Sequence, residues 1–137
     1  MDRTHFEVPP SRNVTAYDAF STECPTRDLL DRLSSKWVSL LLLRLAHGPR
    51  RYAELSRSVT GISPKMLTQT LRRLERDGVI SRTVTPTVPI RTDYELTGLG
   101  HTLLPVMAAL KTWTEDHFEH VQRARADYDG ASAARVS

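Results

Sequence analysis

Cysteine is almost absent from this chain, with Cys24 the only one among 137 residues. A single thiol excludes an internal disulfide framework and fits a reducing cytoplasm. Long apolar runs are missing as well, because Leu40–Leu43 is far too short to span a bilayer. The polar start, MDRTHFEVPPSRN, lacks the features of a signal peptide. We therefore expect a cytoplasmic protein that has no membrane partner.

The chain also lacks the patterns of a catalytic or cofactor site. It has six glycines, and none of them belongs to a phosphate-binding loop. No nucleophile stands at catalytic spacing from a base. His117 and His120 are one helical turn apart, but no cysteine or further histidine is placed to complete a metal site. We expect no enzymatic activity, no cofactor and no metal.

What the sequence does contain is one strongly amphipathic stretch, Ser63 to Asp77. Leu67, Leu71 and Leu74 recur at helical spacing and form an apolar stripe. At about 100° per residue the opposite side carries cations and an amide, namely Lys65, Gln69, Arg72 and Arg76. Ser63 suits the N-cap, Pro64 suits the first helical position, and Gly78 suits the left-handed end. A helix that buries one face and presents positive charge on the other is predicted.

The neighbours of this helix give it a context. Ala53–Val59 predicts a short helix with Leu55 and Val59 inward, and Thr60-Gly61-Ile62 predicts a tight turn. Helix, turn and cationic helix together indicate a helix-turn-helix. Residues 79–84 and 91–96 then alternate as strands around a proline-stiffened loop, which predicts a wing.

Two helices are predicted before this motif and one after it. Pro25 begins the first, with Leu29, Leu30 and Leu33 as its buried side. The second, Lys36–Ala46, is apolar enough to be core, and the residues expected inward are Trp37, Val38, Leu40, Leu41, Leu42 and Leu45. The last helix is capped by Thr97, and Pro105 predicts a kink or restart within it. Its apolar face is predicted to pair with a second subunit, the alternative being that it folds back on its own domain. The dimerisation residues are Leu99, Leu103, Val106, Leu110, Trp113, His117 and Phe118.

These elements predict an α+β fold that is mainly helical, a winged helix-turn-helix domain followed by a long C-terminal dimerisation helix. We expect a flexible N-terminal arm at residues 1–23 and the DNA-binding domain at 24–96. The dimerisation helix is predicted at 97–123, and a frayed tail at 124–137.

Charge is distributed unevenly along this arrangement. The net charge of +3 and pI near 9.3 permit a nucleic-acid partner without requiring one. From Ser63 to Arg82 five basic residues face two acidic ones, whereas from Thr97 to Val121 one basic residue faces three acidic ones. Positive charge therefore gathers on the predicted helix-turn-helix, as double-stranded DNA requires.

A set of short motifs runs along the chain from about Cys24 to Trp113. It includes Cys24-Pro25, Lys36-Trp37, Gly48-Pro49-Arg50-Arg51-Tyr52, Gly61-Ile62-Ser63, Lys65-Met66-Leu67-Thr68, Asp77-Gly78, Val88-Pro89, Arg91, Tyr94 and Leu96-Thr97 with Gly100. In its order and content this set resembles the HxlR family of bacterial winged helix-turn-helix regulators. The resemblance implies a homodimer that binds operator DNA and controls transcription, and steric reasoning favours repression.

Particular residues are expected to contact the DNA. Lys65, Thr68, Gln69 and Arg72 are candidates for base edges, since Gln pairs bidentately with adenine and Arg or Lys with guanine; phosphate contact without base reading is the alternative. Arg91 is a candidate for the minor groove or its phosphates, or else pairs with Asp93 or Glu95. The full predicted DNA-binding set is Lys36, Arg51, Tyr52, Ser63, Lys65, Thr68, Gln69, Arg72, Arg73, Arg82 and Arg91.

The function of the chain is left open between three interpretations, of which the first two differ in the signal that controls a regulator. Cys24 stands at a helix N-terminus, which favours the thiolate, and the family resemblance implies thiol-based sensing of electrophiles or oxidants there. Packing as a small buried hydrophobe is the other role for Cys24. A small-molecule effector, an aromatic one near the dimer interface beside Trp37, Trp113 and Tyr94, is the second interpretation. A protein-interaction module that never reads DNA is the third.

Overall fold

The computed structural model describes residues 17–136, and the side chains up to residue 133. The chain divides into two compact units, Met1–Ser35 and Lys36–Ser137. Most of the arm expected at residues 1–23 lies outside the described residues. The part that is described, from residue 17, forms turns in which Ser21 N–H donates to the Asp18 carbonyl at 3.1 Å and Cys24 N–H to the Ser21 carbonyl at 3.2 Å.

The described part of the first unit contains one helix, α1 (Pro25–Leu33), whose N-cap is Cys24 and whose first residue is the predicted proline. The expected burial of its leucines is wrong. Leu29 and Leu30 are exposed, Leu33 is half-buried, and no residue of α1 is buried. The reason is that residues 17–35 hold no second helix or strand on which this face could pack.

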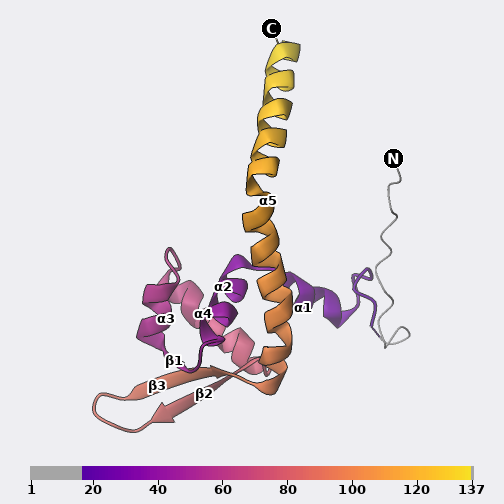
Figure 1. The fold of residues 1–137 in the computed structure, drawn as a ribbon. Coiled ribbons are helices and arrows are strands. Elements are labelled where there is room, and N and C mark those ends of the chain that lie inside the picture. Colours follow the sequence, from indigo (N-terminus) through magenta and orange to yellow (C-terminus); the bar gives the residue numbers. More distant parts are fainter. Residues whose placement is uncertain (1–16, 137) are drawn as a thin grey trace. The chain divides into compact units, whose positions relative to one another are not determined.

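The second unit begins with three helices, α2 (Lys36–Leu45), α3 (Tyr52–Ser58) and α4 (Pro64–Arg76), which surround the core (Figure 1). Leu41, Leu42 and Leu45 of α2 are buried, but Leu40 is 39% exposed and Trp37 only half-buried, so these two are not the core residues that we expected. All-round hydrophobicity did not reveal which side of α2 faces inward. Leu55 and Val59, predicted to point inward, are both buried.

The helix predicted at residues 63–77 is α4, and its ends are built as the sequence indicates. The Ser63 hydroxyl accepts a hydrogen bond from Met66 N–H at 3.1 Å, and Pro64 is the first helical residue. At the other end Gly78 has φ +76°, while Val79 N–H donates to the Leu74 carbonyl at 2.9 Å. These caps fix where α4 starts and stops, and so which of its residues face outward.

The two predicted strands are β2 (Ile80–Thr85) and β3 (Arg91–Leu96), joined by the five-residue loop at 86–90. They pair antiparallel, with Ile80 opposite Leu96 and Arg82 opposite Tyr94. A third strand that we did not predict, β1 (Arg50–Arg51), pairs with β3 to give the order β1-β3-β2. It attaches the residues just before α3 to the base of the wing.

The last element, α5, is one helix that runs from Gly98 to Val136. It continues through Pro105 without a restart, and it contains the residues from 124 onward for which we expected a frayed tail. Alanine and arginine are frequent after residue 122, and both favour helix strongly. Figure 1 shows the later turns of α5 leaving the rest of the second unit.

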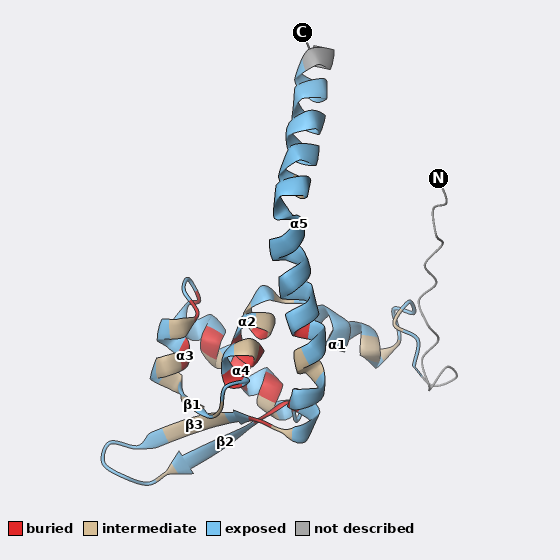
Figure 2. Ribbon diagram, viewed as in Figure 1, coloured by how far each residue is buried: buried red, intermediate tan, exposed pale blue. Residues whose placement is uncertain are grey.

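Burial in the second unit is concentrated where α2, α3, α4 and the sheet meet (Figure 2). From α5, Met107 and Gly100 are buried, and the Ser39 hydroxyl of α2 donates to the Met107 sulfur at 3.1 Å. The rest of α5 is half-buried or exposed wherever its side chains are described. The structure is thus α+β and mainly helical, as predicted.

Candidate nucleic-acid interface

The outer face of α4 is a polar surface held by a buried inner face. Leu67, Leu71 and Leu74 are at most 3% exposed and fix the rotation of the helix about its axis. Thr70, which the sequence did not single out, is also buried and donates its hydroxyl to the Met66 carbonyl at 2.7 Å. The outward residues are exposed and, within residues 17–136, make no side-chain hydrogen bond or ion pair: Lys65, Gln69, Arg72, Arg73 and Arg76.

Two residues expected to contact DNA, Tyr52 and Thr68, contact each other in the free chain. The Tyr52 hydroxyl lies 3.2 Å from the Thr68 hydroxyl and 3.2 Å from the Pro64 carbonyl oxygen. Donation from Tyr52 to Pro64 leaves its oxygen free to accept from Thr68. Tyr52, the first residue of α3, therefore holds the first turn of α4 in place.

The two wing arginines each bind a carboxylate in the free chain. Arg82 Nε lies 3.3 Å from Glu75 Oε2, which joins β2 to α4, and Arg91 Nε lies 2.9 Å from Asp93 Oδ2. Asp93 raises the pKa of the Arg91 guanidinium through this hydrogen bond and its charge. The ion pair of Arg91 with Asp93 was one of the two roles that we left open. All four side chains keep solvent access, so each pair contributes little to stability.

The remaining predicted anchors are spread around this face. Ser63 caps α4 with its hydroxyl and stays exposed, and Arg51 precedes α3, where its backbone N–H donates to Glu54 Oε1 at 3.4 Å. Lys36 begins α2 with its ammonium 4.5 Å from the centre of the Trp37 ring, a cation–π contact. Ser63 and Arg51 thus lie on elements adjoining the first turn of α4.

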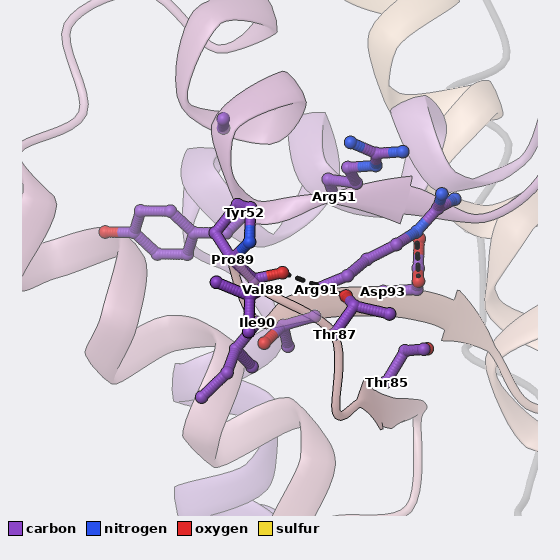
Figure 3. A pocket seen from close by; sticks show the side chains of 11 residues that line it. Arg51, Tyr52, Thr85, Thr87, Val88, Pro89, Ile90, Arg91 and Asp93 are labelled. Atoms are coloured by element: carbon purple, nitrogen blue, oxygen red, sulfur yellow. Dashed lines mark hydrogen bonds and ion pairs between the residues drawn. The ribbon is translucent and has the colours of Figure 1, made fainter.

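A hollow of about 790 Å³ separates the start of α3 from the wing (Figure 3). Arg51 and Tyr52 line one side, and Val88, Pro89 and Ile90 of the wing loop line the other. Figure 3 shows the Tyr52 ring at one end of the hollow and the paired Arg91 and Asp93 side chains at the other. The strand pair β1–β3, which the sequence did not reveal, brings these two sides together.

Tyr94 of β3 lies half-buried beneath this surface. Burial raises the pKa of its phenol more than the nearby positive charges of Arg82 and Arg72 lower it. Tyr94 therefore stays neutral, and it lies opposite Arg82 of β2 and Arg50 of β1 in the sheet. None of Trp37, Trp113 and Tyr94, which we expected beside an effector, lines the hollow between α3 and the wing.

The apolar face predicted for dimerisation lies on the exposed side of α5. Leu99, Val106, Leu110, Trp113 and Phe118 are each more than half exposed in the single chain, and Leu103 is half-buried. Trp113 stacks on His117 with ring centres 4.7 Å apart, and His117 Nδ1 lies 2.9 Å from the Trp113 carbonyl oxygen. Met107 is a buried α5 side chain that the spacing rule missed, and its sulfur accepts the hydrogen bond from Ser39 of α2.

The Cys24 thiol, in the first unit, has a hydrogen-bond partner two residues further along the chain. Its sulfur lies 3.0 Å from the Thr26 hydroxyl. Hydrogen bonds from Thr26 lower the pKa of the Cys24 thiol, and slight burial opposes them only in part. The side chain is half-exposed within this unit.

A helix-turn-helix with a cationic outer helix, followed at once by a two-stranded wing, defines a winged-helix DNA-binding protein. The model of the HxlR-like helix-turn-helix family matches residues 32–122. The chain therefore belongs to the HxlR-like helix-turn-helix family of transcriptional regulators.

Known proteins agree with this assignment. The chain is 36% identical over 119 residues to the uncharacterized HTH-type transcriptional regulator YtfH of Escherichia coli K12, covering 87% of this chain and 94% of that one. The solved structure of YtfH from Salmonella typhimurium is similar with a TM-score of 0.77 and 37% identity, over 80% of this chain and 98% of that one. The oxidized form of the redox regulator HypR is similar with a TM-score of 0.62 and 38% identity, over 68% and 96% of the two chains.

The relatives are regulators of transcription rather than enzymes. Among the helices of residues 17–136, none combines the length and the apolar character that crossing a membrane requires.

Proposed function

We propose that this chain is a homodimeric, sequence-specific repressor that places α4 in the major groove of a pseudo-palindromic operator. One observation carries the proposal. The outer face of α4 holds Lys65, Gln69 and Arg72, exposed and without a side-chain partner in the described part of the chain, on a helix whose rotation is fixed by three buried leucines. Long polar side chains on a fixed helix are what base reading in the major groove requires.

The roles within this face are divided by position. Lys65, Gln69 and Arg72 read base edges, and Arg73 and Arg76 contact phosphates. Ser63 stands at the helix N-terminus, where the partial positive charge favours a phosphate. Tyr52 and Thr68, bonded to each other, position the first turn of α4. The DNA backbone around α4 is contacted by four further cations, Arg51, Lys36, Arg82 and Arg91. On binding, Arg82 and Arg91 each exchange their carboxylate partner for a phosphate.

Binding to duplexes selected from a random-sequence pool tests this role. We expect Gln69→Ala and Arg72→Ala each to weaken binding by about 1–3 kcal/mol and to relax sequence preference. The matched control is Arg125→Ala, which removes an exposed arginine from the distal part of α5 and leaves binding unchanged. Affinity should also fall steeply between about 50 and 200 mM salt. Full affinity in both α4 variants contradicts the assignment.

The second copy is proposed to cover the exposed apolar face of α5. An apolar stripe from Leu99 to Phe118, half exposed along its length, is costly in water and is buried economically against its own copy. Such a dimer sets the spacing of two α4 helices to successive major grooves, about 34–36 Å apart.

Sedimentation measures this association. We expect Leu110→Glu to convert a dimer to a monomer, because it places a charge within the stripe. Gln122→Glu adds the same charge to an exposed polar position of the same helix and should leave the dimer intact. A monomeric wild-type chain, or a Leu110→Glu chain that still dimerises, contradicts the α5 interface.

Regulation by a thiol switch at Cys24 has its own support. The sulfur is half-exposed, stands at the N-cap of α1 and has a lowered thiol pKa, all of which favour reaction with electrophiles. A solved relative, HypR, is named as a redox regulator and is 38% identical. With one cysteine per chain, the products are an adduct, a mixed disulfide or a disulfide between subunits.

A gel shift before and after diamide or quinone treatment tests the switch. We expect treatment to change the DNA affinity of the wild type and to leave Cys24→Ser unaffected. Equal responses in the two proteins remove the idea while leaving the DNA-binding proposal untouched.

A further inference from the structure

The tip of the wing has no charge at all. From Thr83 to Ile90 eight consecutive residues carry neither a cation nor a carboxylate, in a chain that is 26% charged. The flanking cations, Arg82 and Arg91, are both bound to carboxylates. A wing that touched DNA through phosphates alone would have its cations at the tip, so this tip is built for another kind of contact.

The tip is instead apolar and fully presented to solvent. Val88 is 101% exposed and Ile90 71%, and Pro86 and Pro89 flank Val88 on either side. Together with Val84, which is 47% exposed, they place three exposed apolar side chains on the tip, and clustered exposed apolar groups, unlike single ones, mark binding surfaces.

The tip is also held in shape before any partner arrives. Thr87 N–H donates to the Thr85 carbonyl at 2.8 Å, and the Thr87 hydroxyl donates to the Pro89 carbonyl at 2.9 Å (Figure 3). Two prolines restrict the loop further. Little conformational entropy remains to be lost when Val88 and Ile90 enter a partner.

Duplex DNA is the partner that the surroundings favour. The tip borders the hollow that Arg51 and Tyr52 line, and Tyr52 contacts the first turn of α4. The apolar tip therefore continues the proposed DNA face and has cations beside it for the phosphates on either side. Proteins that bind the minor groove frequently insert apolar side chains as wedges between base steps, which unstack and bend the duplex.

We propose that Val88 and Ile90 form an apolar wedge that enters the minor groove beside the α4 site and bends the operator there. This inference rests on the proposed DNA binding and adds a deformation of the DNA. Steps that unstack easily are then favoured at the wedge, and a guanine amino group projecting into the minor groove opposes it.

The test uses the full-length chain and a duplex of about 40 base pairs that the wild type selects from a random pool. Energy transfer between dyes at the two ends reports the bend, with the double variant Val88→Ser, Ile90→Ser compared with wild type. Both side chains are exposed, so the variant should fold as the wild type does. Phe20→Ser is the matched control, because Phe20 is 91% exposed and lies in the other unit.

We expect wild type and Phe20→Ser to bend the duplex by between about 20° and 90° and the wing variant to leave it straight. The wing variant should also bind about tenfold more weakly, as loss of the burial of one or two aliphatic side chains implies. A second measurement changes the DNA: replacing flanking G·C pairs by inosine·C removes the minor-groove amino group alone. This replacement should tighten wild-type binding and leave the wing variant unchanged.

Other outcomes overturn the inference in distinguishable ways. A straight duplex in the wild-type complex, or an equal bend with the wing variant, excludes the wedge while DNA binding stands. A wing variant that loses self-association shows that the tip binds a second copy instead. A wild type that selects no duplex overturns the proposed function and the wedge together.

Discussion

The Thr97 hydroxyl lies 2.6 Å from the carbonyl oxygen of Gly78, so one side chain joins the end of α4 to the beginning of α5. The same hydroxyl lies 3.0 Å from the Val79 carbonyl and accepts the Gly100 N–H at 3.1 Å. The helix that is proposed to read DNA and the helix that is proposed to dimerise therefore share one cap. A change in the direction of α5 is transmitted to the end of α4 through these bonds.

Thr97→Val keeps the shape of the side chain and removes the hydroxyl. We expect a loss of about 1–2 kcal/mol in the free energy of unfolding, because the cap of α5 and the bond to Gly78 both disappear. Thr97→Ser, which retains the hydroxyl, is the control and should stay within about 0.5 kcal/mol of wild type. Urea unfolding followed by circular dichroism measures both variants. Similar losses in the two would mean that the methyl group matters and the bonds do not.

Gly100→Ala tests the close approach of α5 to the chain after α4. A β-carbon at residue 100 would overlap the Val79 carbonyl oxygen and crowd Leu96, so the helix would have to move away. We expect a loss of about 1–3 kcal/mol of stability. Gly98→Ala places the same methyl group in open space on the same helical turn and should change stability by less than about 1 kcal/mol. Thermal unfolding of the two variants measures this difference, and equal melting temperatures would contradict the close contact of Gly100 with Val79.

Tyr52→Phe tests whether this residue positions α4 or contacts DNA. Removal of the hydroxyl breaks the bonds to Pro64 and Thr68, and we expect a loss of about 1 kcal/mol in stability without DNA present. In a double-mutant cycle, Thr68→Val should cost less in the Tyr52→Phe background than in wild type. Additive costs, together with weaker DNA binding at an unchanged salt dependence, would place the hydroxyl on a phosphate instead.

The pH dependence of Cys24 alkylation follows from its hydrogen bonds. Thr26 favours the thiolate and lowers the thiol pKa, so the rate with iodoacetamide should rise at lower pH than for an ordinary cysteine. Thr26→Val removes the hydroxyl bond, which raises the pKa and slows the reaction near neutral pH. Thr26→Ser retains the bond and serves as control. Coincident pH–rate curves for wild type and Thr26→Val would show that the Thr26 hydroxyl does not set the thiolate population.

The elements that the sequence predicted correctly are those whose signals are local. Ser63, Pro64 and Gly78 mark the ends of α4 chemically, and the spacing of its leucines fixes its inner face, so helix and burial were both confirmed. The strands of the wing alternate over six residues each, which is long enough to recognise.

The elements that were missed depend on contacts distant in sequence. β1 is two residues long and exists because Arg50 and Arg51 pair with β3, which no local pattern reveals. The same holds for Tyr52 and Thr68: each is polar and on the expected face, yet sixteen positions apart they satisfy each other. The predicted burial of Leu29 and Leu30 was wrong for a different reason. Apolar spacing predicts a helix face that needs a packing partner, but it does not say whether the same chain supplies that partner.

The uninterrupted α5 is 39 residues long, which at 1.5 Å per residue is roughly 58 Å. Its first turn is fastened at Thr97 and Gly100, whereas its later described side chains are exposed. If α5 stays straight and pivots at its first turn, beside Gly78, a tilt of about 10° moves its far end by roughly 10 Å. The largest displacement along α5 therefore occurs at its far end, and a label near Tyr128 reports small rotations of the first turn of α5 most sensitively.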